Sequence, residues 1–175
     1  MALNKWLLAL ALVILTVSID QLAKLWILDN VAYLETRPII ASWQPYLQIT
    51  RTINTGIAFG LAIGGNTVVL ILSVVITLGL LWMLKSAQAP ERLQQIALAL
   101  VIGGAVGNII DRVRLGHVVD FVHITIPGII SNVSNFADHF VVIGVGLLLL
   151  DSFINPQIST DEPQTADETR VSKIS

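Results

Sequence analysis

The chain has 175 residues, a formal net charge of −2, and a composition that is 54% hydrophobic and 13% charged. A soluble domain is typically about 45–50% apolar and about 25% charged, so this chain is expected to be a membrane protein with one main domain. Disulfides, a thiol nucleophile and zinc–thiolate sites are excluded because the chain contains no cysteine, and a nucleic-acid partner is disfavoured because no basic block appears.

Four segments are apolar enough to cross a bilayer, namely residues 6–28, 67–84, 93–110 and 137–154. About 20 apolar residues span the hydrocarbon as a helix, and only a helix satisfies its own backbone groups there. The sequence therefore predicts an all-α membrane protein with four transmembrane helices in residues 1–154. The first segment is interpreted as a span rather than a signal peptide because no small-residue cleavage site follows it. Gly103 and Gly107 have the GxxxG spacing that favours close helix packing.

The two longer connections, residues 29–66 and 111–136, fall on the same side of a four-span protein. Within them, residues 46–53 alternate in polarity and residues 118–126 are rich in β-branched side chains, which predicts strands. We therefore expect a small extramembrane β-sheet cradle. The polar tail, residues 155–175, is expected to be disordered. Lysine and arginine counts are nearly equal on the two sides, so they leave the orientation open.

Ionisable side chains at membrane depth are costly and are candidates for a functional site. Asp20 and Lys24 lie four residues apart on one face of the first span, where either a structural or a functional ion pair fits. A second polar cluster follows the third span in the segments GNIIDR (107–112), GHVVDF (116–121) and SNFAD (134–138).

Two aspartates of this second cluster could form a catalytic pair. Neighbouring carboxylates share a proton, so that one acts as a base on water and the other as an acid, with no metal or cofactor. The spacing alone leaves either Asp111 or Asp120 as the partner of Asp138, whose position at a helix start also fits a simple cap. Asp120 is flanked by apolar residues, which favours a functional role.

Other chemistries fit less well. The histidines at 117, 123 and 139 lack the HExxH spacing of a zinc site, and Asp20 would keep Lys24 charged and therefore non-nucleophilic. A small transporter or ion-binding helix bundle remains the main alternative, although its acids would be expected near the bilayer midplane rather than at span ends. An assembly subunit with a buried ion pair is the third possibility.

At these residues the chain resembles the lipoprotein signal peptidases, the type II signal peptidases of bacteria. DQLAK (20–24) is similar to the family's DQxxK, NTGIAF (54–59) to its NxGxAF, and SNFAD to its FNxAD, while GNIIDR and GHVVDF follow in the family order. The five motifs are distributed over nearly the whole chain, in the family's order and among four predicted membrane helices of the expected spacing.

The resemblance implies an aspartic endopeptidase that cleaves diacylglyceryl-modified prolipoproteins on the amino side of the lipidated cysteine. It implies catalytic roles for Asp120 and Asp138, and structural polar roles for Asp20, Lys24 and Asp111. The residues that it implies in substrate binding or dyad support are Asn54, Gly56, Asn108, Arg112, Asn135 and Ala137. One departure is Ser134, where the family usually has Phe; Phe136 occupies the variable position instead, and we expect activity to survive this change.

The resemblance also implies a location in the bacterial inner membrane, among membrane lipids. Both termini would be cytoplasmic, and the active site would lie near the periplasmic face. We expect the protein to act as a monomer.

Overall fold

The computed structural model describes residues 5–56, 65–86 and 92–155. Within these ranges lie four helices, α1 (Lys5–Asn30), α2 (Gly65–Ser86), α3 (Arg92–Leu115) and α4 (Phe136–Ile154). All four are long and apolar enough to cross a membrane, which confirms the predicted spans. The predicted tail beyond residue 155 and the part of the NTGIAF motif after residue 56 lie outside the described residues.

The third helix differs from the prediction at its carboxyl end. It continues to Leu115, five residues beyond the predicted span, and so includes Asp111 and Arg112, which their spacing from Asn108 had placed on one helical face. Hydropathy places the boundary at the first charge, whereas the helix continues because Asp111 is buried against Lys24 from α1. The polar end of α3 is therefore held rigidly against the bundle.

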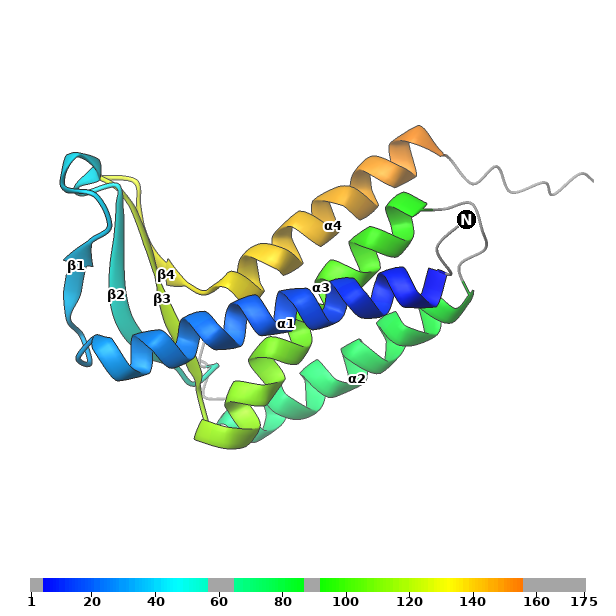
Figure 1. The fold of residues 1–175 in the computed structure, drawn as a ribbon, viewed down its shortest axis with the longest axis horizontal. Helices are drawn as coiled ribbons and strands as arrows, with labels where there is room; N and C mark the ends of the chain where they lie inside the picture. Colours follow the sequence, from blue (N-terminus) through cyan, green and yellow to red (C-terminus); the bar gives the residue numbers. More distant parts are fainter. Residues whose placement is uncertain (1–4, 57–64, 87–91, 156–175) are drawn as a thin grey trace, which may run out of the picture.

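A four-stranded antiparallel sheet stands at one end of the bundle, in the order β1 (Thr36–Pro38), β2 (Leu47–Asn54), β3 (Val118–Ile126) and β4 (Ile130–Ser134). A short 3-10 helix, η1 (Ala41–Trp43), joins β1 to β2. The two strands predicted from the sequence correspond to β2 and β3. Figure 1 shows that the strands run across the direction of the helices, and that the start of α1 and the end of α4 lie at the opposite end.

Small residues let α3 pack closely against two neighbours. A Cβ added at Gly103 would collide with Thr16 of α1, and one at Gly104 would collide with the Ala137 carbonyl oxygen of α4. This agrees with the packing role predicted for the glycines, since small side chains allow helix backbones to approach. α3 therefore forms the centre of the bundle, in contact with each of the other three helices.

An apolar cluster joins the sheet to the helices. Ile27 and Val31 at the end of α1 are buried against Val119 and Phe121 of β3. Because side chains alternate along a strand, this contact turns Asp120 to the opposite face of β3. The register of the sheet thus fixes the direction in which the carboxylate points.

Candidate functional site

The two aspartates of interest come from different elements that meet beside α3. Asp120 lies on β3 opposite Thr52 of β2, immediately after a register shift between Ile49 and Thr52. Asp138 lies in the first turn of α4. Asp120 is only 3% exposed, so its environment decides its protonation.

Two asparagines hold the Asp120 carboxylate. The amide nitrogen of Asn135 donates to Oδ1 at 2.5 Å, and that of Asn54 donates to Oδ2 at 3.1 Å. The Asn54 side chain is itself fixed, because its oxygen accepts a 2.9 Å hydrogen bond from the backbone N–H of Gly56. Gly56 has a φ of 78°, a left-handed conformation that favours glycine.

Burial raises the pKa of the Asp120 carboxyl from its ordinary 3.8 to about 6, and the negative charge of Asp138 adds to the rise. The hydrogen bonds from Asn135 and Asn54 and the positive charge of Lys24 oppose it. Desolvation disfavours the charged form of an acid, which is why burial dominates. Asp120 can therefore retain a proton in mildly acidic solution.

Asp138 is held by the start of its own helix and by α3. Asn135 is the N-cap of α4: its side-chain oxygen accepts from the backbone N–H of Asp138 at 3.0 Å, and the Asp138 carboxylate accepts from the Asn135 backbone N–H in a capping box. The amide nitrogen of Asn108 donates to Asp138 Oδ1 at 2.8 Å. The cap that the sequence suggested for Asp138 is thus present, with Asn135 as the N-cap.

A buried ion cluster lies behind the two aspartates. Lys24 Nζ is 2.8 Å from Asp20 and 2.9 Å from Asp111, and it donates a 3.0 Å hydrogen bond to Asn108 Oδ1. These contacts bring together the predicted Asp20–Lys24 pair and the polar end of α3. Asp111 is thus paired with Lys24, whereas Asp120 and Asp138 both hydrogen-bond to the side chain of Asn135.

Two further predicted site residues border this region. Ala137 is fully buried, and its backbone N–H donates to Asp20 Oδ1 at 2.9 Å. Arg112 interacts electrostatically with both Asp138 and Asp120. Its buried Nε has no hydrogen-bond partner among the residues that the structure describes, so one donor is available to a ligand.

Sequence reasoning missed the contribution of Gln21. Its amide nitrogen lies within hydrogen-bonding distance of the Gly107 carbonyl, at 3.1 Å, and of Asp111 Oδ1, at 3.0 Å. The signal was present, because a glutamine beside Asp20 inside an apolar segment is itself costly to bury without partners.

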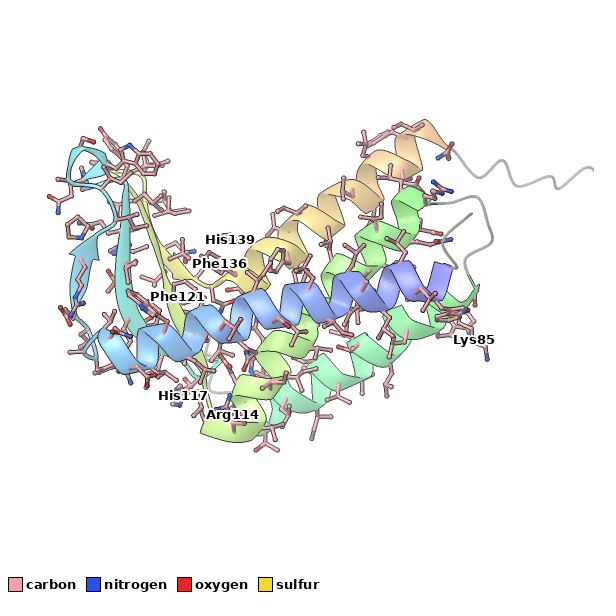
Figure 2. All side chains as sticks on the ribbon, viewed as in Figure 1. Lys85, Arg114, His117, Phe121, Phe136 and His139 are labelled. Atoms are coloured by element: carbon pink, nitrogen blue, oxygen red, sulfur yellow. The ribbon has the colours of Figure 1, made fainter. Side chains whose placement is uncertain are left out.

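Ser134, the departure from the family pattern, ends β4 just before α4 begins. Its hydroxyl lies 3.3 Å from His139 Nε2. The rings of Phe121 and Phe136 pack edge to face at 5.1 Å, where the sheet meets α4 (Figure 2). Phe136, two residues after Ser134, therefore places an aromatic ring against Phe121.

Metal binding finds no support in the described part of the chain, where no group of three or more His, Cys, Asp or Glu side chains could hold a metal ion. The arrangement instead offers a buried carboxyl with a raised pKa, a second carboxylate at a helix start, and polar donors around both. Such a set can move a proton to and from a reacting water.

Comparisons with known proteins give consistent results. A family model described as signal peptidase (SPase) II matches residues 12–154. Lipoprotein signal peptidases from Brucella ovis and Brucella melitensis are each 39% identical over 150 residues, covering 83% of this chain and 89% of the relative.

Solved structures agree with this result. One, described as a bacterial membrane enzyme determined by the in meso method at 2.3 Å, is 30% identical with a TM-score of 0.74, covering 88% of this chain and 92% of its own. Another, described in the same way at 1.9 Å, is 29% identical with a TM-score of 0.76, covering 84% and 93%. This chain therefore shares its fold with two proteins that are described as bacterial membrane enzymes.

Proposed function

Because the chain belongs to the signal peptidase II family, a family of peptidases, we propose that it removes the signal peptide from diacylglyceryl-modified prolipoproteins. The cleaved bond lies on the amino side of the lipidated cysteine, and two aspartates perform the chemistry. Peptidase activity is favoured over ion transport by a helix bundle, because the members of the family are peptidases.

The single observation that supports the aspartic mechanism best is the sharing of Asn135 by Asp120 and Asp138. The residue orients one carboxylate with its amide nitrogen and positions the backbone of the other with its oxygen. A pair of carboxylates with one shared proton provides both a base and an acid. The involvement of Asp111 with Lys24 supports Asp120 as the partner of Asp138.

The two aspartates have different proposed roles. Asp120, with its pKa raised to about 6, holds the proton and donates a hydrogen bond to the scissile carbonyl oxygen as that oxygen becomes negative. Asp138, held by Asn108 and the start of α4, accepts a proton from water as the water oxygen bonds to the carbonyl carbon. The proton then passes to the leaving amine nitrogen as the C–N bond breaks.

The surrounding residues support this chemistry. Asn54 and Gly56 orient Asp120, and Asn108 and Ala137 support the start of α4. The Nε of Arg112, which has no hydrogen-bond partner within residues 5–56, 65–86 and 92–155, is proposed to donate to a backbone carbonyl of the substrate. Substrate and dyad meet where the helices meet the sheet, which suits a lipid-anchored peptide that diffuses in the bilayer.

The test of the activity uses the purified chain in detergent micelles with a diacylglyceryl-modified prolipoprotein. Mass spectrometry should find a product that begins with the lipidated cysteine, and the same precursor without the lipid should be cleaved more slowly. A folded protein that leaves the modified precursor intact would contradict the proposal.

We also propose that both termini are cytoplasmic and that the sheet and dyad lie at the periplasmic face of the inner membrane. The arrangement in Figure 1 supports placing both termini on one side, since the start of α1 and the end of α4 both lie at the end of the bundle opposite the sheet. A reporter fused after residue 175 should be active only in its cytoplasmic form. Periplasmic activity would contradict the orientation.

A further inference from the structure

One buried lysine connects the segments that carry the two proposed catalytic aspartates. The Lys24 ammonium contacts the carboxylates of Asp20 and Asp111 on two different helices. All three residues are at most 2% exposed. A charged group at this depth is stable only when it is paired and hydrogen-bonded, so the geometry of the cluster is narrowly defined.

Each carboxylate of this cluster also holds the backbone immediately before a proposed catalytic residue. Asp20 Oδ1 accepts from the N–H of Ala137, the residue before Asp138, at 2.9 Å. Asp111 Oδ2 accepts from the N–H of Val119, the residue before Asp120, at 3.1 Å. Lys24 is thus linked to each of these two backbone positions through a single carboxylate.

A third contact of Lys24, with Asn108, links it to the carboxylate of Asp138. Lys24 donates to Asn108 Oδ1, and the Asn108 amide nitrogen donates to Asp138 Oδ1. An ammonium can only donate, so it forces the oxygen of the Asn108 amide toward itself and the nitrogen toward Asp138. The orientation of this amide is therefore determined by the lysine.

We propose that Lys24 is a positioning residue, which sets the placement of Asp120 and Asp138 relative to each other. It acts through its three partners and touches neither substrate nor water. This inference rests on the proposed function, because the aspartate pair is part of that proposal. A displacement of about 1 Å in a catalytic site can lower the rate about a hundredfold, so replacement of Lys24 should cause a measurable decrease in the cleavage rate.

Removal of the lysine charge should also change the pH dependence. Asp120 is faced by Asp138 from α4, by Lys24 from α1 and by Arg112 from α3, together with the neutral amides of Asn54 and Asn135. The Lys24 charge lowers the pKa of Asp120. Without that charge the Asp120 proton is held to higher pH, so the decline of kcat/KM with increasing pH should begin later.

The experiment compares Lys24→Met with Thr16→Val in the full chain, using the cleavage assay described above. Thr16 is as buried as Lys24 on the same helix, and among the described residues its hydroxyl donates to the carbonyls of Leu12 and Val13 alone. For Lys24→Met we expect kcat to fall at least about tenfold, KM to stay within about twofold, and the decline of kcat/KM to move to higher pH. Thr16→Val should match the wild type in all three.

A second variant covers the case in which Lys24→Met does not fold. Lys24→Met combined with Asp20→Asn removes one charge of each sign, and the new amide oxygen can still accept from Ala137. Its kcat should show the same decrease. A folded variant with wild-type kcat and pH profile would overturn the positioning role while leaving the proposed function intact, whereas failure of the wild type to cleave would overturn the proposed function.

Discussion

The side-chain amide of Asn135 donates a 2.5 Å hydrogen bond to the carboxylate of Asp120. The oxygen of the same amide accepts from the backbone N–H of Asp138 at 3.0 Å. Because Asn135 is also the N-cap of α4, the residue that starts the helix is the one that joins the two proposed catalytic groups. One side chain therefore both caps α4 and contacts the two proposed catalytic residues.

Asn135→Ala should impair both stability and catalysis. Loss of an N-cap lowers the free energy of unfolding by about 1 kcal/mol. Leaving the buried Asp120 oxygen without its hydrogen bond lowers it by about 1–3 kcal/mol more. We expect a lower unfolding temperature and a decrease in kcat of at least about tenfold. Asn155→Ala is the matched control, because Asn155 is the exposed C-cap of the same helix. A folded Asn135→Ala protein with wild-type kcat would contradict the shared role.

The pH dependence of kcat/KM should follow the proton on Asp120. Its raised pKa of about 6 means that the group is protonated below that pH and ionised above it. If Asp120 serves as the acid, kcat/KM should fall about tenfold per pH unit well above pH 6. The measurement is initial rates at low substrate concentration from about pH 5 to about pH 8. A rate that increases through this range would exclude Asp120 as the proton donor.

Gly104→Ala should loosen the contact between α3 and α4. A Cβ there would collide with the Ala137 carbonyl oxygen and come within 2.8 Å of Val141 Cγ2. Overpacking of this kind typically costs about 1–3 kcal/mol, so the unfolding temperature should fall. Gly146→Ala on α4 is the control, since in the described part of the chain no atom beyond its own helix backbone and chain neighbours lies within 4 Å of the added Cβ. Equal effects of the two substitutions would contradict close packing at Gly104.

Ser134→Phe should give no large gain in turnover. The aromatic ring expected at this position is already supplied by Phe136, which packs on Phe121. Ser134 is 8% exposed and contacts His139, so a larger side chain would displace existing neighbours. Ser152→Phe at an exposed position of α4 controls for added apolar surface. A large increase in kcat for Ser134→Phe would show that the serine limits activity.

Hydropathy could predict the membrane helices because each span is long and nearly free of charge. It placed the end of α3 too early because Asp111 is stabilised there by Lys24, a partner far away in sequence. β1 and β4 are short strands whose pairing depends on β2 and β3, so their own residues carry little signal. The strand pattern was clear only in the two longer central strands.

The candidate site residues could be named from motifs, but the contacts among them could not. No pattern in one sequence indicates that Lys24 orients Asn108, or that Asp111 holds the backbone N–H of Val119. Such contacts depend on how α1, α3 and β3 pack together. Spacing alone left Asp111 and Asp120 open as partners of Asp138, and the resemblance to the family favoured Asp120. The packing of Asp111 against Lys24 is consistent with that proposal.

Substitution of Asp120 and Asp138 tests the claim that these two residues carry out the cleavage. Asp120→Asn, Asp138→Asn and Asp111→Asn are compared with the wild type in a gel-shift assay on the diacylglyceryl-modified prolipoprotein, each variant being checked for folding. Asp120→Asn and Asp138→Asn should abolish cleavage, while Asp111→Asn, which weakens only the supporting cluster, should retain some. Normal cleavage by Asp120→Asn together with complete loss in Asp111→Asn would contradict the claim.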